Sequence, residues 1–187
     1  MTEWNRRLLI LWSWFVRIST NFLPDSVWTM RLRGRLYGVA MKRCGIDFQV
    51  GSQVTLIGLQ NISVGNHVYI APSVVCLASH DIEFEHEVMI AYHSVITDGN
   101  HTAIHGSYRY GPRREAAVHV GRGAWISANC TLLPGVTIGS GTVVAANSAV
   151  SRDLPENSVS GGVPARVLSG GPSLDPKTKY ESRRNAA

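Results

Sequence analysis

Cysteine is scarce in this sequence, with only Cys44, Cys76 and Cys130 among 187 residues. The three lie far apart and form no CxxC pair, and a chain of this length does not depend on covalent staples. A disulfide framework and a zinc ribbon are therefore both disfavoured. This cysteine usage fits a reducing, cytoplasmic compartment.

Long hydrophobic runs are also missing. The longest apolar stretch, Leu8–Val16, is far shorter than the roughly 20 residues that a spanning helix needs. It follows Arg6 and Arg7 as a signal peptide would, but it is rich in tryptophan and no small-x-small cleavage site follows it. The stretch predicts an uncleaved helix that either packs on the core or lies in a membrane interface.

Acidic residues are few before residue 46, whereas basic residues are frequent there. The whole chain has a net charge of +5 and a pI near 9.4, which suggests anionic partners such as phosphates, acidic sugars or a lipid surface. The basic residues lie among helix-forming aliphatic residues without a nucleic-acid-binding motif, so no nucleic-acid partner is expected. They are Arg6, Arg7, Arg17, Arg31, Arg33, Arg35, Lys42 and Arg43.

A six-residue repeat dominates the rest of the chain. Aliphatic residues recur at a strict spacing of six over VGRGAW, ISANCT, LLPGVT, IGSGTV and VAANSA, and the same phase returns earlier in the sequence. Neither a helix nor a simple strand has this period. The repeated positions are Val64, Ile70, Phe84, Ile90, Ile96, Val120, Ile126, Leu132, Ile138, Val144 and Val150.

Three such hexads make an 18-residue coil in which each hexad forms one short strand and each junction turns a corner. Equivalent residues then stack at strand spacing, about 4.8 Å, with the six-spaced side chains pointing inward. Gly65, Gly121 and Gly139 follow inward residues, with Asn66 nearby, and we expect them to supply the positive φ that the corners require.

This pattern resembles the hexapeptide-repeat acyltransferases over about residues 46–168. The resemblance implies an all-β fold, a left-handed parallel β-helix of hexapeptide repeats, here with an N-terminal helical extension. The expected division is a helical extension over residues 1–45, an acyltransferase domain over 46–168 and a flexible tail over 169–187. The tail is polar and rich in glycine, proline and charge.

The repeat is interrupted once, over residues 97–117, where a polar loop replaces the hexads. Long loops in compact repeats are often functional. His101 lies early in this loop, in GNHT, at a place that resembles the position of the catalytic histidine in sugar and antibiotic acetyltransferases. The resemblance implies that His101 is the general base. His105 lies four residues further on, but this spacing joins two metal ligands only on a helix, so no metal is expected.

The segment from GRGAW to GGVPARVL closely resembles the closing stretch of maltose and galactoside O-acetyltransferases. By that resemblance it holds acetyl-CoA as co-substrate, between two subunits of a homotrimer. An arginine suits the phosphates of this donor because its planar fork donates two hydrogen bonds. The positions carried over are Trp125, Ala128, Ala146, Ser151, Arg152 and Arg166.

The same resemblance implies that Tyr69, Ala71 and Asn100 bind the acceptor substrate. Soluble-sugar acetylating relatives have an asparagine where this chain has Ala71, so we expect a different acceptor.

The residues before the repeat predict a second helix, with Asp25 or Ser26 as its N-cap and Gly45 at its close. Two helices before a hexapeptide domain resemble the O-acetyltransferases of lipopolysaccharide and capsule synthesis. Such helices either cover the open end of the first coil or contact a membrane.

The sequence therefore predicts a cytoplasmic O-acetyltransferase of a cell-surface polysaccharide, with peripheral contact to the inner face of the membrane as a further feature. Its acceptor is a sugar, a sugar nucleotide or a lipid-linked oligosaccharide. N-acetylation of an amino-sugar nucleotide is the alternative. A metal-dependent hydratase and a catalytically silent scaffold are less favoured.

Overall fold

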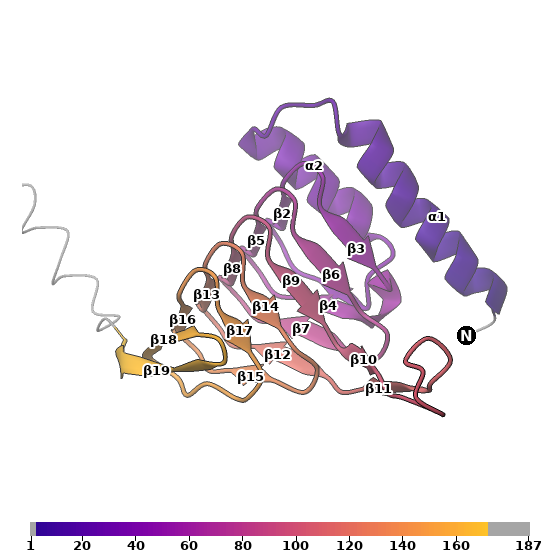
Figure 1. Cartoon of the computed structure of the whole chain (residues 1–187). Coiled ribbons are helices and arrows are strands. Elements are labelled where there is room, and N and C mark those ends of the chain that lie inside the picture. Colours follow the sequence, from indigo (N-terminus) through magenta and orange to yellow (C-terminus); the bar gives the residue numbers. More distant parts are fainter. Residues whose placement is uncertain (1–2, 172–187) are drawn as a thin grey trace, which may run out of the picture.

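The computed structural model describes residues 3–171, with side chains from Arg7 onward, and shows a three-sided solenoid preceded by two helices (Figure 1). The tail predicted over residues 169–187 lies outside the described residues from residue 172 onward. Each coil contributes one short strand to each of three parallel sheets, here called faces A, B and C. The predicted parallel β-helix of hexapeptide repeats is confirmed.

Face A is a sheet of five strands in the order β1 (Arg43–Cys44), β4 (Ile62–Val64), β7 (Ile82–Phe84), β12 (Val118–Val120) and β15 (Thr137–Ile138). Face B has the order β19 (Ala165–Gly170), β18 (Ser158–Gly162), β16 (Val143–Val144), β13 (Trp125–Ile126), β8 (Met89–Ile90), β5 (Tyr69–Ile70) and β2 (Gln49–Val50). Face C has the order β17 (Ala149–Val150), β14 (Thr131–Leu132), β9 (Val95–Thr97), β6 (Val75–Leu77) and β3 (Thr55–Ile57). Within the three faces the strands pair in parallel except for β18 and β19, which form an antiparallel hairpin.

The core is the set of six-spaced side chains, which fill the inside of the solenoid. All eleven of them have no exposed surface. They form one stack behind each face. In face B, for example, Ile70, Ile90 and Ile126 occupy equivalent positions in successive strands. The hexapeptide phase read from the sequence is therefore confirmed.

The corners of the coils differ from the prediction. Gly65, Gly121 and Gly139 do not have positive φ, and neither does Asn66. A β-carbon at Gly139 would lie 2.2 Å from the backbone nitrogen of Glu156. These glycines are therefore explained by the close approach of the next coil, since any side chain would collide with its backbone.

Positive φ occurs instead three residues after an inward side chain, where glycine and asparagine tolerate it most easily. Other residue types share this place, which shows that the coil geometry imposes the conformation. The residues at this position are His67, Ser73, Glu87, His93, Gly123, Asn129, Gly135, Gly141 and Asn147.

Two helices, α1 (Glu3–Thr20) and α2 (Val27–Gly38), lie over the first coil. The N-cap of α2 is Ser26, which is one of the two residues predicted for this position. The predicted close at Gly45 is wrong, because α2 ends at Gly38 and β1 already pairs with β4 at Arg43. None of the described helices is long and apolar enough to cross a membrane.

An ion pair joins α2 to the first corner of the solenoid. Arg31 Nε donates to Asp47 Oδ1 over 2.5 Å, and His67 and Gln49 also contact this carboxylate. The hydrogen bond from Arg31 is the main cause that lowers the pKa of Asp47 to about 2.

The low pKa of Asp47 predicts a specific dependence of stability on pH. Because the pKa is lower in the folded state, the ionised carboxylate stabilises the fold above its ordinary value of 3.8, and this contribution is lost as the pH falls toward 2. We expect Asp47→Asn to lower the free energy of unfolding at neutral pH and to flatten its fall below pH 4. Urea titrations at a series of pH values measure this, and parallel curves for both proteins would contradict it.

Candidate active site

The interruption of the repeat forms a hairpin that leaves the solenoid where face C passes into face A. Its strands, β10 (Gly99–His101) and β11 (Arg113–Glu115), pair antiparallel between β9 and β12 (Figure 1). His101 is the last residue of β10 and lies opposite Arg113, with its side chain exposed. The hairpin therefore holds the predicted base on a paired strand, away from the packed core.

Asp98 fixes the start of this hairpin. Its side chain is fully buried, and its carboxylate accepts hydrogen bonds from the backbone N–H groups of Ser79, His80 and Asp81 at 2.7 to 2.9 Å. A carboxylate with several N–H donors tolerates burial. Asp98 was not predicted from the sequence, where its only signal is an acidic residue three places before His101.

The surroundings of His101 are polar and mostly basic. Asn100 Oδ1 accepts a hydrogen bond from the backbone N–H of His101 at 3.0 Å. The guanidinium group of Arg113 lies beside Gly99, where a β-carbon would be 2.6 Å from its Nη2. A guanidinium group beside a reacting thioester can stabilise the negative charge that develops during acyl transfer.

On face B, the predicted residues Tyr69 and Trp125 occupy one row of the outer surface. Both pair with Met89, which lies between them in the register. Trp125 is 43% exposed and Met89 40% exposed. Burial raises the pKa of Tyr69, with a smaller contribution from Tyr92, an exposed tyrosine that the sequence did not single out.

Ala71, in the same coil as Tyr69, has no exposed surface, and its backbone N–H donates to Ile90. The methyl group of Ala71 is therefore part of the solenoid wall. A ligand bound to one chain cannot contact it.

The other predicted donor residues lie at three places. Ala128 and Ala146 lie on successive coils just after face B, where the N–H of Asn147 donates to the carbonyl of Ala128 at 3.0 Å. Ser151 and Arg152 follow the last strand of face C and are exposed. Arg166 lies in β19 and is also exposed, with Nη1 donating to its neighbouring carbonyl at Ala165.

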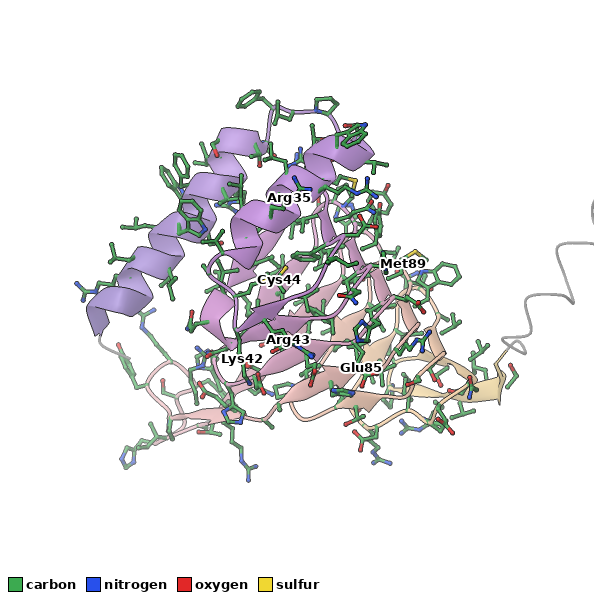
Figure 2. All side chains as sticks on the ribbon, turned by 180° about the vertical axis from the view of Figure 1, so that it is seen from behind. Arg35, Lys42, Arg43, Cys44, Glu85 and Met89 are labelled. Atoms are coloured by element: carbon green, nitrogen blue, oxygen red, sulfur yellow. The ribbon has the colours of Figure 1, made fainter. Side chains whose placement is uncertain are left out.

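The structure does not bring His101 and the row on face B together within one chain. The β10–β11 hairpin and face B lie on opposite sides of the solenoid in Figure 1, and Figure 2, seen from behind, places Met89 of face B far from the hairpin. A site that contains both His101 and Trp125 therefore needs two chains. Among the side chains that the structure describes, from Arg7 to residue 171, no three His, Cys, Asp or Glu residues are grouped to hold a metal ion.

Comparisons with known proteins agree with this architecture. Residues 117–152 match the family described as bacterial transferase hexapeptide (six repeats). The chain is 34% identical over 117 residues to a putative lipopolysaccharide biosynthesis O-acetyl transferase, WbbJ, of Escherichia coli strain K12, covering 58% of this chain and 57% of the relative. It is 30% identical over 108 residues to the galactoside O-acetyltransferase of the same strain, covering 58% and 53%. The alignments thus span about half the length of these curated relatives.

Among solved structures, the chain is similar to a hexapeptide-repeat acetyltransferase from Vibrio cholerae O1 biovar eltor in complex with acetyl coenzyme A. The two share 25% sequence identity and a TM-score of 0.78 over 88% of this chain and 87% of the other. The resemblance to the hexapeptide-repeat acyltransferases predicted from the sequence is confirmed. The names of these relatives and the bound acetyl coenzyme A support the predicted class of enzyme and its co-substrate.

Proposed function

We propose that this protein is an acetyl-CoA-dependent O-acetyltransferase that acts on a sugar hydroxyl in the synthesis of lipopolysaccharide, capsule or exopolysaccharide. The observation that carries this proposal is the hairpin that holds His101 outside an otherwise regular solenoid. The similarity to a putative lipopolysaccharide O-acetyl transferase supports the class of acceptor. A reducing, cytoplasmic location is part of the proposal, since the three cysteines are free.

In the proposed reaction, the imidazole of His101 accepts the proton of the acceptor hydroxyl while its oxygen attacks the thioester carbonyl of acetyl-CoA. Imidazole suits this task because its ordinary pKa is near neutral. The tetrahedral oxyanion then collapses, the carbon–sulfur bond breaks, and His101 returns the proton to the CoA thiolate. Transfer is direct, in a complex of all three partners. Asn100 and Tyr69 are proposed to contact the acceptor, with Ala71 at the position where soluble-sugar relatives carry an asparagine.

The donor is proposed to lie along the last coils. Trp125 would pack near the reacting centre, and the small side chains of Ala128 and Ala146 would leave room for the pantetheine arm beside exposed backbone. Ser151, Arg152 and Arg166 would bind the adenosine end, where the arginines meet phosphate.

The separation of His101 from face B supports a homotrimer. If His101 of one chain faces Trp125 of the next, three copies close a ring and complete three equivalent sites. Within the described part of one chain, the two groups lie on opposite sides of the solenoid.

The two arginines at the adenosine end lead to a prediction about donor binding. We expect Arg152→Ala combined with Arg166→Ala to raise the dissociation constant of acetyl-CoA at least about tenfold, because each loses a charge-assisted hydrogen bond to phosphate. Isothermal titration calorimetry measures this. Arg122→Ala is a matched control, since Arg122 is exposed but pairs with Glu87. Equal affinities for both variants would contradict the assignment.

N-acetylation of an amino-sugar nucleotide is the alternative, because an amine can attack the same thioester. Free CoA release, measured with a panel of neutral saccharides, sugar nucleotides and amino-sugar nucleotides, distinguishes the two. The proposal expects neutral saccharide acceptors to give the faster release. Faster release with the amino-sugar nucleotides would establish the alternative.

A further inference from the structure

Helix α1 packs on the solenoid with a face that is partly polar. Val16 is fully buried against the first coil, and Ser13 beside it donates a hydrogen bond to the carbonyl of Leu56. Thr20 is buried as well, donating to the carbonyl of Val16 at 2.7 Å. The inner face of α1 therefore uses small hydroxyl side chains among its contacts.

The outer face of α1 is the more apolar one. Large apolar residues follow one another at alternating spacings of three and four, which places them on one stripe along the helix. Trp14 adjoins this stripe and is 51% exposed. The stripe, here called the outer stripe, consists of Leu8 (58% exposed), Leu11 (59%), Phe15 (53%) and Ile18 (52%), and Phe22 (79%) lies in the turn that follows α1.

Nothing in the described part of the chain covers the outer stripe. The solenoid fills its own interior with the six-spaced side chains, and α2 lies on the other side of α1, toward the first coil. Single exposed apolar residues are common on proteins, but a continuous apolar stripe marks a contact surface. We therefore expect the outer stripe to bind a partner.

The charge around the helices indicates the nature of this partner. Residues 1–45 contain eight basic and two acidic residues, whereas residues 46–187 contain ten basic and eleven acidic ones. The excess positive charge of the sequence thus lies in the helical extension, although Lys42 and Arg43 pair with Asp81 and Glu83 of the solenoid. The described side chains of α1 and α2 include five arginines and no acidic residue. Arg33 is buried against Asp25 and Arg31 pairs with Asp47, so the outward charge of the two helices rests on the exposed Arg7 and Arg35.

We infer that the outer stripe of α1 docks on an anionic lipid bilayer, with α1 lying in the plane of the interface. An apolar helix face with aromatic residues and surrounding basic side chains is typical of such helices. The position of α1 fits this arrangement, since α1 forms an outer edge of the molecule (Figure 1).

Helix α1, which carries the outer stripe, adjoins the hairpin that carries His101. The N-terminal end of α1 lies on the same side as β10 and β11 in both figures. A cavity of about 330 Å³ lies between them. Its lining includes Ile10 of α1, Arg113 of β11, and Ser79 of the preceding coil. Docking would therefore bring the hairpin close to the bilayer, where a lipid-linked saccharide presents its sugar. Docking itself does not depend on the proposed reaction.

The test is co-sedimentation of the full chain with vesicles of phosphatidylethanolamine and phosphatidylglycerol. We expect binding that weakens with added salt, because the attraction to anionic headgroups is screened. Leu11→Gln combined with Phe15→Gln should lower the partition coefficient about tenfold or more, since both side chains would leave the apolar layer. Val39→Gln combined with Ile46→Gln is the matched control, because these exposed apolar residues lie off the outer stripe. The control should bind like the unaltered protein.

Circular dichroism first verifies that both variants are folded, which the exposure of the altered residues leads us to expect. Failure of the unaltered chain to bind these vesicles would overturn the inference, as would equal binding by the Leu11/Phe15 variant. A Leu11/Phe15 variant that changes the oligomeric state in gel filtration would instead assign the outer stripe to contact between copies of this chain. Acetyl transfer to a water-soluble saccharide, assayed without vesicles, reports separately on the proposed function.

Discussion

His101→Ala should lower kcat for acetyl transfer by about 10²- to 10⁴-fold, which is the usual contribution of a positioned general base. The acceptor hydroxyl is a poor nucleophile while it retains its proton, and no other side chain is assigned to remove it. Since His101 is not proposed to hold the donor, the affinity for acetyl-CoA should stay unchanged. Free CoA release under saturating donor measures the first quantity, and calorimetry measures the second.

His105→Ala is the control for this experiment. His105 is an exposed histidine of the same loop, four residues beyond His101, but it lies at a turn with a φ of 48° and not on β10. Its removal should leave kcat within about twofold, as expected for a surface residue outside the site. Full activity of the His101→Ala variant would remove the base from the mechanism.

Arg33→Ala should lower the free energy of unfolding by about 3–5 kcal/mol, the usual cost of breaking a buried ion pair by removing one partner. The side chain of Arg33 is 2% exposed and pairs with Asp25 over 2.5 Å. Its guanidinium group also donates to the carbonyls of Thr20, Leu23 and Val50. It thereby joins the turn between the two helices to the first coil, and its loss leaves several acceptors unpaired.

Urea unfolding of the purified protein measures this change. Arg35→Ala is the matched control, since Arg35 is an exposed arginine two residues further along α2, and it should change stability by less than about 0.5 kcal/mol. A similar small change for Arg33→Ala would mean that its hydrogen bonds contribute little to the fold.

The solenoid could be predicted because one physical requirement repeats every six residues. Each inward side chain, such as Val120 or Ile126, must fill the same interior space, so the requirement is visible in the sequence itself. The role of the glycines at the corners could not be predicted in the same way. Gly121 and Gly139 are required by contact with the next coil, and that contact exists only between segments about 18 residues apart, so local preferences could not reveal it.

The site was predictable in position but not in geometry. The interruption and its histidine were evident, whereas the pairing of His101 with Arg113 and the buried carboxylate of Asp98 depend on contacts across the hairpin and the previous coil. The orientation of α1 was not predictable either. Its periodicity indicates an apolar stripe, but it does not tell whether that stripe faces the solenoid or the solvent.

The most direct test of the central proposal is the fate of a deuterated acetyl group supplied on acetyl-CoA. After incubation with the protein and a polysaccharide acceptor, mass spectrometry should find the labelled group on the saccharide. It should be removed by mild alkali, because an ester is cleaved where an amide is stable. A labelled group that resists alkali would contradict O-acetylation, and absence of transfer to any saccharide, with acetyl-CoA bound, would contradict the proposed function.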